Sequence, residues 1–450
     1  MIQPMTGTLE GITWPPMFAA HAPLAALVEH LETTQWLPTD EICALQGRQL
    51  SALIAFHARH SEALRGQLSE AGLAPADFAD IGTLSHLPIQ SRAALHQLAS
   101  APPVTAIPAA HLPIGSTQSS GSTGIPVTVR KTQVNALMWS ALTVRLHRWS
   151  EPDGFGRLAV IRADTPADTQ ADQWPAPMSL LHTTGPVCFV PLDAGIAEQT
   201  TMLAAFKPDS ILGYPHSIGA LIRTEGGRAA LSTVRRVKTF SETVSDELRA
   251  AIKEATGATL FDSYSTQEVG YIAHQCPAGS GYHAMAEALI VEIVNAHGLP
   301  CAAGEAGRVL VTDLLNLATP VIRYDIGDLA VQGESCACGR GLPTLARIMG
   351  RTRGMRVSRD GAREWPVALF RKFDAIAPVI QFQIIQHEID RFELRVATPS
   401  PLSAHQETQL VTLVETAMGE GAICTISGFI DRLPVGPNGK IEDFVSLIGA

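Results

Sequence analysis

Residues 116–126 read STQSSGSTGIP, a run of Ser and Thr with two glycines that ends at a proline. Glycines let backbone N–H groups converge on anionic oxygens, and the hydroxyls add further hydrogen-bond donors. The stretch therefore predicts a phosphate-binding loop, although its composition also suits a flexible linker. The Walker pattern G-x-x-x-x-G-K-[ST] is absent, so the rest of the chain has to decide between the two.

The segments after this loop alternate between short apolar runs and helical stretches. The apolar runs are residues 157–163, 187–192, 210–214 and 258–264, and the helical stretches include 218–231 and 245–257. This alternation predicts an α/β fold with a parallel sheet. Two later apolar runs, 287–294 and 307–314, leave little room for crossover helices. They predict an antiparallel or barrel-like layer after the parallel one.

The two ends of the chain have a different pattern. Leucines recur at helical spacing over residues 50–68 and predict a core-facing helix in a helical N-terminal part of about 100 residues. Beyond residue 350, segments 381–385 and 392–396 alternate with period two, 402–418 is helical and 422–430 predicts a last strand. We expect a large N-terminal α/β domain with a barrel-like β layer (1–350) and a small mobile C-terminal α+β domain (351–450).

Composition restricts the class of protein. The chain has 450 residues, of which 46% are hydrophobic and 17% charged, as in globular proteins. A net charge of −10 without a basic run argues against nucleic acid or an anionic membrane as partner. The N-terminus does not resemble a signal peptide, and the seven cysteines are an odd number spread thinly. These features favour a cytoplasmic protein with reduced thiols that acts on small molecules.

Further motifs follow the loop in chain order. They are DSYSTQEVG (262–270), VIRYDIGDLA (321–330), IMGRTRGM (348–355) and LPVGPNGKIEDF (433–444). Taken singly, Glu268 reads as a helix-start carboxylate, Asp328 as a turn residue and Lys440 as a solvated loop cation. Their occurrence together in this order argues against coincidence and for one shared site.

Residues 111–132 and these motifs resemble the adenylate-forming superfamily of acyl-CoA synthetases and adenylation domains. The resemblance implies that Tyr264 stacks near the adenine of ATP, that Glu268 binds Mg²⁺ and that Asp328 accepts hydrogen bonds from the ribose. It further implies that Arg351 lies next to the nucleotide and that Lys440 is the catalytic lysine. The phosphate loop would consist of Ser119, Ser120, Gly121, Ser122, Thr123 and Gly124.

Residues 50–73 and 81–97 are similar to the N-terminal helices of the phenylacetate-CoA ligase-like branch of that superfamily. This branch implies a carboxylic acid as substrate, with ATP, Mg²⁺ and coenzyme A. By analogy, the acid is aryl or arylacetic. The small domain would present Lys440 for adenylation and then rotate about the Gly350–Gly354 hinge for thioester formation.

Three departures from the family pattern leave alternatives open. Gln267 stands where relatives have a hydroxyl, so Thr266 becomes the substitute phosphate contact. Arg353 replaces an acidic hinge residue, and Glu242 in FSETVS (240–245) is a weaker match for the adenine-binding stretch. One alternative is transfer of the adenylate to a carrier-protein thiol or an amine. Another is a nucleotide-binding, zinc-stabilised regulatory protein without ligase activity.

The cysteines form a second constellation. Cys276 and His283 are seven positions apart, and Cys336 and Cys338 form a Cys-x-Cys pair. Three thiolates and one imidazole satisfy tetrahedral zinc, with His274 as an alternative fourth ligand, although unpaired thiols in reduced loops fit the spacing too. Some members of the phenylacetate-CoA ligase-like branch, which the chain resembles, carry a structural zinc at comparable positions. Four protein ligands close the coordination sphere, which implies a structural role for the metal.

The identity of the acid is not readable from the sequence. The resemblance places the acid pocket between residues 211–221 and the run 241–264, so Tyr214, His216 and Phe261 are candidates for its lining. Ordinary packing of an α/β sheet explains the same residues equally well. We expect a homodimer, the commonest oligomeric state.

Overall fold

The fold is taken from a computed structural model, which describes residues 11–15, 23–100, 106–119, 126–166, 169–279, 281–365, 369–434 and 441–448. The chain divides into two compact units. The first comprises Met1–Trp149 and Ser263–Met349, and the second comprises Ser150–Asp262 and Gly350–Ala450. The boundary between Asp262 and Ser263 falls within strand β8 (Thr259–Thr266).

Helices form the N-terminal part of the first unit. They are α1 (Pro23–Thr34), α2 (Thr39–His60), α3 (Glu62–Ala71), α4 (Arg92–Ser100) and α5 (Gln133–Ser150). The expectation of one helix over residues 50–68 is wrong, because the chain breaks at Ser61, whose φ of −126° and ψ of 112° are extended. The Ser61 side chain accepts a hydrogen bond from the Leu64 backbone N–H and so begins α3. The leucine pattern continues across the break because both helices use it for packing.

The antiparallel layer expected from the sequence is confirmed in the first unit. Its strands are β9 (Gly270–Gln275), β10 (Tyr282–Ala284), β11 (Leu289–Val294), β12 (Ala306–Asp313), β13 (Tyr324–Gln332) and β14 (Thr344–Arg351). Their order in the sheet is β11-β12-β13-β14-β10-β9-β8. The strands run antiparallel in the pairs β11/β12, β12/β13, β14/β10, β10/β9 and β9/β8. The hairpin β1 (Gly115–Gln118) and β2 (Thr128–Lys131) flanks the expected phosphate loop.

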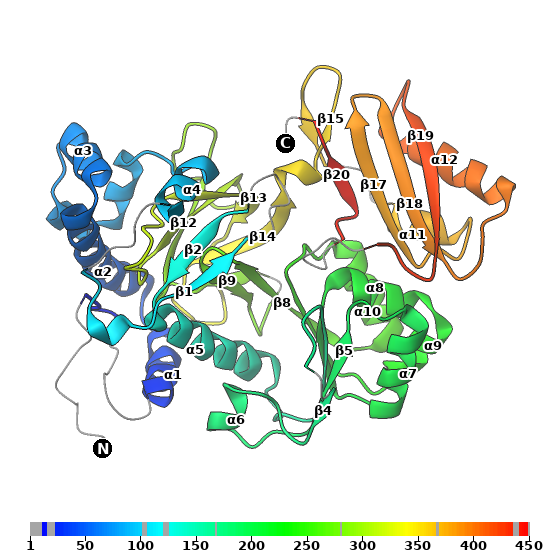
Figure 1. The fold of residues 1–450 in the computed structure, drawn as a ribbon, viewed down its shortest axis with the longest axis horizontal. Helices are drawn as coiled ribbons and strands as arrows, with labels where there is room; N and C mark the ends of the chain where they lie inside the picture. Colours follow the sequence, from blue (N-terminus) through cyan, green and yellow to red (C-terminus); the bar gives the residue numbers. More distant parts are fainter. Residues whose placement is uncertain are drawn as a thin grey trace. The chain divides into compact units, whose positions relative to one another are not determined.

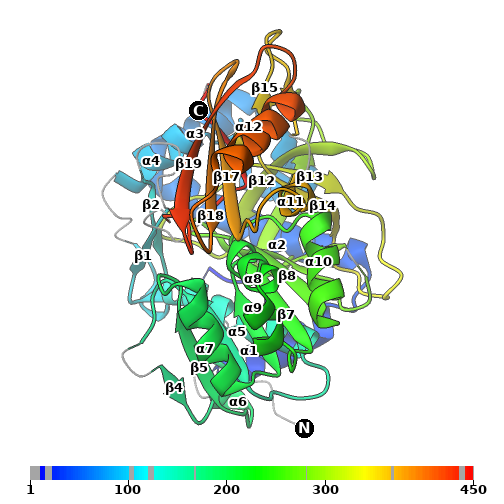
Figure 2. The same cartoon turned by 90° about the vertical axis from the view of Figure 1, so that its right-hand side faces the viewer.

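The second unit contains the expected parallel strands. They are β3 (Leu158–Arg162), β5 (Val187–Pro191), β6 (Ser210–Gly213) and β7 (Arg236–Phe240), in the order β8-β7-β6-β3-β5 with β4 (Gln170–Ala171) antiparallel at the edge. Helices α6 (Met178–Leu181), α7 (Ile196–Phe206), α8 (Pro215–Arg223), α9 (Glu225–Ala230) and α10 (Asp246–Thr256) connect them. Figure 2 looks onto α7 to α10 in front of these strands, and Ile211, Leu221 and Val237 are fully buried between the layers.

The C-terminal segment has a separate α+β core, as expected. The strands β17 (Gln381–Glu388), β18 (Arg391–Thr398), β19 (Ile423–Ile430) and β20 (Phe444–Ser446) form a sheet in the order β19-β18-β17-β20. Helix α12 (Ala404–Met418) packs on this sheet (Figure 1). The short hairpin of β15 (Arg356–Val357) and β16 (Arg363–Glu364) and helix α11 (Phe370–Asp374) come before the sheet in the chain. Segment 422–430 is not the last strand, because β20 follows it and pairs in parallel with β17. The boundary at residue 350 and the mobility of this segment stay predictions.

None of the helices among the described residues combines the length and apolarity that a membrane span needs.

A buried ion pair joins α5 to the turn before β11. Arg145 donates to both carboxylate oxygens of Glu287, at 2.7 and 3.0 Å, and both side chains are at most 1% exposed. Burial alone raises the pKa of Glu287, but the attraction and hydrogen bonds of Arg145 lower it below its usual value. The stabilisation is therefore present above the unfolded-state pKa and is lost as the pH falls through the folded-state pKa.

We expect Arg145→Met to lower the free energy of unfolding by about 3–5 kcal/mol at neutral pH, because it leaves the Glu287 carboxylate buried without a counter-charge. Denaturant titration measures the change. The double variant Arg145→Met/Glu287→Met removes both charges and should recover most of the loss. A single variant as stable as the parent would contradict this account.

Candidate nucleotide site and metal centre

The base of the expected phosphate loop is closed by Ser119 and Val127. The Ser119 backbone N–H donates to the Val127 carbonyl at 2.8 Å, and the Val127 N–H donates to the Ser119 hydroxyl at 2.9 Å. This arrangement holds the two ends of the Gly/Ser/Thr stretch together, as a loop that surrounds a ligand requires. Ser120, Gly121, Ser122, Thr123 and Gly124 lie outside the described residues, so their phosphate contacts stay a prediction.

Glu268 lies in the turn after β8, close to this hairpin. The Thr117 hydroxyl and the Lys131 ammonium each donate to the main-chain carbonyl of Gln267 at 2.8 Å. These two hydrogen bonds link the hairpin to the Glu268 turn through the main chain of Gln267, so they do not depend on the side chain at this position. The Thr266 hydroxyl accepts a hydrogen bond from the Val269 N–H at 3.4 Å, which orients it inside the turn.

Two residues expected at the nucleoside are brought together. The Tyr264 hydroxyl on β8 donates to Oδ2 of Asp328 on β13 at 2.7 Å, although 64 positions separate them in the sequence. Both side chains are buried, at 8% and 6% exposure. The tyrosine and the carboxylate thus form one hydrogen-bonded pair in the first unit, the same unit that holds Glu268.

The oxygen ligands at Glu268 fit the magnesium that the resemblance implies. Mg²⁺ prefers hard oxygen ligands and is usually held by one or two carboxylates together with substrate phosphates. Glu268 presents a carboxylate that is 6% exposed, two positions after the Thr266 hydroxyl. A buried carboxylate is stabilised by a cation, and an oxygen ligand at this position suits a divalent ion that arrives with ATP.

Glu242 in the second unit contacts Ile441, which follows Lys440 in the sequence. Its carboxylate accepts from His216 Nδ1 at 2.7 Å and from the Ile441 backbone N–H at 2.9 Å. Nearby, desolvation and the charge of Glu242 raise the pKa of Asp443 to about 6. Lys440 itself lies outside the described residues. Glu242 therefore binds the residue that follows the expected catalytic lysine, and its place at adenine stays a prediction.

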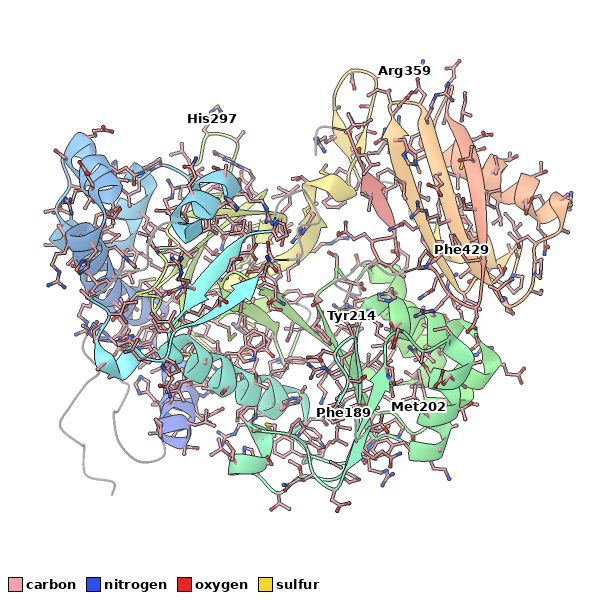
Figure 3. All side chains as sticks on the ribbon, in the orientation of Figure 1. Phe189, Met202, Tyr214, His297, Arg359 and Phe429 are labelled. Carbon is pink, nitrogen blue, oxygen red and sulfur yellow. The ribbon has the colours of Figure 1, made fainter. Side chains whose placement is uncertain are left out.

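Tyr214 and Phe261 belong to the second unit and are both buried. Tyr214, labelled in Figure 3, precedes α8 and belongs to the apolar core with Ile218 and Leu221. Its ring centroid is 4.8 Å from that of Phe240. Phe261 on β8 is only 4% exposed. Packing in the core accounts for Tyr214, and contact of Tyr214, Phe261 or His216, which pairs with Glu242, with an acid is a proposal.

The expected hinge begins at the end of β14. Gly350 has a φ of +95°, and a Cβ at this position would lie 2.7 Å from the Thr243 hydroxyl, so a glycine is required here. Arg351 is the last residue of β14 and is half-buried. The side chain of Arg353 lies outside the described residues. Rotation about this segment stays a prediction.

The four expected metal ligands converge in the first unit. The ligand atoms of Cys276, His283, Cys336 and Cys338 all lie within 4.8 Å of one another. The sulfurs of Cys276 and Cys336 are 3.7 Å apart, close to the roughly 3.8 Å between tetrahedral ligands with zinc–sulfur bonds of about 2.3 Å. Cys338 Sγ is 3.3 Å from His283 Nε2. The donor set and its spacing fit a closed zinc site.

Histidine hydrogen bonds decide between the two candidate imidazoles. His283 Nδ1 lies 3.3 Å from the Leu342 carbonyl, which places the proton on Nδ1 and leaves Nε2 facing Cys338. His274 is not part of the cluster. Its Nδ1 bonds the Ser263 hydroxyl at 2.9 Å and its Nε2 bonds the Leu142 carbonyl at 3.2 Å. The alternative ligand is therefore wrong, because both of its ring nitrogens are used inside the fold.

The loop that carries Cys336 and Cys338 is clamped by Arg340. Its guanidinium lies 4.4 Å from the ring centroid of Trp36 and 4.6 Å from that of Trp149. Arg340 Nε also donates to the Gln35 side-chain oxygen at 2.8 Å. The loop is thus attached to the turn after α1 and to α5 of the first unit, where a structural ion would stabilise tertiary contacts.

Several residues near the nucleotide cluster were not singled out from the sequence. They are Arg92, Thr117 and Lys131, which contact Ser119, Gln267 or Glu268. Lys131 lies in the stretch that follows the phosphate loop, but a surface cation is its ordinary interpretation. Arg92 begins α4 and lies in the segment 81–97 that resembles the N-terminal helices of the branch, but nothing in that resemblance gave this residue a role.

Comparison with curated proteins identifies relatives along most of the chain. Phenylacetate-coenzyme A ligase of Escherichia coli (strain K12) is 27% identical over 376 residues, covering 79% of this chain and 82% of the relative. The enzyme of the same name from Thermus thermophilus is 24% identical over 407 residues, covering 81% and 83%. No protein-family model matches the chain.

Solved structures agree on the fold. A 2-hydroxyisobutyryl-CoA ligase in the postadenylation state has a TM-score of 0.68 at 18% identity, covering 98% of this chain and 97% of that one. The same ligase with 2-HIB-AMP and CoA in the thioesterification state has a TM-score of 0.60 at 18% identity. The chain therefore has the fold of the adenylate-forming CoA ligases. Within that class, the chain is similar to curated relatives that are phenylacetate-coenzyme A ligases, which supports a phenylacetate-CoA ligase-like branch.

Proposed function

We propose that the protein is an ATP-dependent, AMP-forming ligase that joins a carboxylic acid to coenzyme A. The observation that carries the proposal is the cluster in the first unit, where Tyr264 bonds Asp328 and Glu268 lies beside the base of the phosphate loop. The resemblance assigns these groups to adenine, ribose and magnesium. The curated relatives named phenylacetate-coenzyme A ligase support the same chemistry.

In the first step, a carboxylate oxygen of the acid attacks the α-phosphorus of ATP. The bond from the α-phosphorus to the bridging oxygen breaks, and pyrophosphate leaves with that oxygen. Glu268 would hold the magnesium, which when bound neutralises charge on the phosphates. The loop after Ser119 would bind the β- and γ-phosphates, with Thr266 as a further hydroxyl contact. Lys440 would stabilise the charge shared between carboxylate and α-phosphate.

In the second step, the sulfur of coenzyme A attacks the acyl carbon. The bond between that carbon and the AMP oxygen breaks, AMP leaves, and the thiol proton passes to solvent. Lys440 has no role in this step, so it must withdraw from the acyl-adenylate before the thiol arrives. Rotation of the C-terminal domain about Gly350–Gly354 is the movement that we propose for the exchange.

The acid that we propose is aryl or arylacetic, because both relatives with matches over most of the chain are named for phenylacetate. Tyr214, His216 and Phe261 are the proposed lining of its pocket. A neighbour of the same fold is named for 2-hydroxyisobutyrate, an aliphatic hydroxy acid. The substrate panel has to include both chemical kinds.

The proposed centre at Cys276, His283, Cys336 and Cys338 binds one structural zinc ion. With four protein ligands it has no open position for substrate, so the metal takes no part in the two chemical steps. A cytoplasmic location is part of the proposal, since ATP and coenzyme A are available there. A homodimer is proposed as the oligomeric state, to be measured by light scattering of the purified protein.

We expect acid-dependent exchange of labelled pyrophosphate into ATP with at least one acid from a panel of phenylacetate, benzoate and 2-hydroxyisobutyrate. Adding coenzyme A should then release AMP and form the thioester, because the adenylate is its substrate. Exchange without a thioester would favour a carrier-protein thiol or an amine as the acceptor. Absence of exchange with every acid would favour the regulatory, nucleotide-binding alternative. Glu268→Gln is the control that should suppress the exchange.

A further inference from the structure

Arg92 bridges two parts of the nucleotide cluster. It is the first residue of α4, and one terminal nitrogen of its guanidinium donates to the Ser119 hydroxyl at 2.7 Å. The other terminal nitrogen donates to Oε1 of Glu268 at 3.4 Å. Its partners are 27 and 176 positions away in the sequence. One cation therefore contacts both the base of the phosphate loop and the proposed magnesium ligand.

The Glu268 carboxylate needs such a cation while no nucleotide is bound. Its side chain is 8% exposed, and a buried carboxylate without a counter-charge is costly. An arginine stays protonated under all ordinary conditions, so its guanidinium supplies a permanent positive charge. The Arg92 side chain is 32% exposed, which gives the guanidinium an adjacent region of solvent into which it can turn.

The two contacts of Arg92 differ in strength. The 2.7 Å hydrogen bond to Ser119 is short, whereas the 3.4 Å contact with Glu268 is near the limit for a hydrogen bond. Ser119 is itself held by two hydrogen bonds to Val127. When a competing cation approaches Glu268, the longer contact is the one that yields. Arg92 can then stay attached to the loop.

The surrounding links keep this geometry in place. Thr117 and Lys131 both hold the Gln267 carbonyl, so the hairpin and the Glu268 turn cannot separate readily. Burial lowers the pKa of Lys131, and the negative charges of Asp313 and Glu268 partly offset this effect by raising it. The Lys131 ammonium donates its hydrogen bond to a main-chain carbonyl of the turn. Arg92 contacts the carboxylate itself.

We propose that Arg92 is a positioning residue that takes the place of the magnesium ion at Glu268 in the nucleotide-free protein. It neutralises the carboxylate and gives it up to the incoming Mg²⁺–ATP, while its bond to Ser119 keeps the phosphate loop closed at its base. The inference rests on the proposed function, because it requires Glu268 to be the magnesium ligand.

If Arg92 and Mg²⁺ compete for Glu268, removing Arg92 should lower the Mg²⁺ concentration that ATP binding requires. In Arg92→Met, the Mg²⁺ concentration that half-saturates ATP binding should fall by roughly fivefold, since the ion no longer displaces a guanidinium from Glu268. Isothermal titration calorimetry with ATP at a series of Mg²⁺ concentrations measures this without turnover. The melting temperature of the ligand-free variant should also fall, and its rise on adding Mg²⁺–ATP should exceed that of the parent.

Three further proteins make the result specific. Arg148→Met is the matched control, because Arg148 contacts Glu29 at the same 3.4 Å elsewhere in the first unit, and its Mg²⁺ dependence should equal that of the parent. Arg92→Lys keeps the charge and should shift the dependence less than Met does. In Arg92→Met/Glu268→Gln, the Mg²⁺ dependence should match that of Glu268→Gln alone, because the partner of Arg92 is gone.

The outcomes separate the inference from the function on which it rests. A weaker ATP affinity at saturating Mg²⁺ with an unchanged Mg²⁺ midpoint would make Arg92 a phosphate ligand and overturn the inference alone. A lower melting temperature with no change in Mg²⁺ dependence would assign it a merely structural role, with the same consequence. If the parent binds no ATP in a Mg²⁺-dependent manner, or Glu268→Gln leaves that dependence unchanged, the assignment of Glu268 fails and the inference fails with it.

Discussion

Replacing Lys440 by Ala should slow formation of the acyl-adenylate by about 10²–10³, the range found when one electrostatic stabiliser is removed. Negative charge is shared between the attacking carboxylate and the α-phosphate in the transition state, where a fixed ammonium stabilises it more than in the ground state. The lysine follows Pro437, Asn438 and Gly439, which favour a turn. Its neighbour Ile441 is bonded to Glu242, so the segment has a defined attachment in the second unit.

The two half-reactions have to be measured separately. Pyrophosphate exchange reports adenylation, and thioester formation from pre-made acyl-adenylate reports the second step, which should fall far less. Lys372→Ala, an exposed lysine of the same C-terminal segment, is the matched control and should leave both rates unchanged. Equal losses in the two half-reactions, or no loss in the first, would show that Lys440 does not have this role.

Removing one ligand of the metal centre should have the second large effect. The parent protein should carry about one zinc ion per chain, and Cys338→Ser should lose it together with several kcal/mol of apparent stability, because metal binding to a folded site is folding free energy. Cys338 lies 3.3 Å from His283 Nε2, inside the cluster. Its loop holds Arg340 between Trp36 and Trp149, so loss of the metal should also change tryptophan fluorescence.

Elemental analysis and thermal melts test this prediction. Cys43→Ser is the control, since Cys43 is a free thiol on α2 outside the cluster, and this variant should keep its zinc and its melting temperature. Protein purified without a chelator that contains no zinc would remove the claim. A Cys338→Ser protein that retains both the metal and the stability of the parent would show that the ligand set is wrong.

Local sequence patterns determined the classes of the structural elements. Apolar runs separated by helical stretches predicted the parallel strands of the second unit. Apolar runs with little room for a helix between them predicted the antiparallel strands of the first unit. These predictions succeed because burial of one face imposes a periodicity on nearby residues. The break at Ser61 and the strand β20 were missed, since a single capping hydroxyl and a three-residue strand leave little periodic signal.

The cluster of three cysteines and one histidine could be suggested from the sequence because zinc chemistry restricts the residue types. The Cys276–His283 and Cys336–Cys338 pairs offer zinc ligands but also fit unpaired thiols, and the resemblance to a branch with a structural zinc favoured the metal. The structure brings the four ligand atoms together although the two pairs are far apart in the chain. The choice of imidazole needed the structure. Both nitrogens of His274 are used by Ser263 and the Leu142 carbonyl, contacts that spacing in the sequence cannot express.

By itself, the sequence determined the order of the motifs and the fold class, because these depend on residue type and local periodicity, and the resemblance of the motifs to the adenylate-forming superfamily implied the kind of chemistry. Only the tertiary structure decided which side chains share a charge or a hydrogen bond. Arg92 meets Glu268 across 176 positions, and Glu242 meets the Ile441 N–H across 199. Arg92 had no role assigned to it from the sequence, and the partner of Glu242 is a main-chain atom. Such contacts arise when sheets and helices pack, so no short stretch of sequence records them.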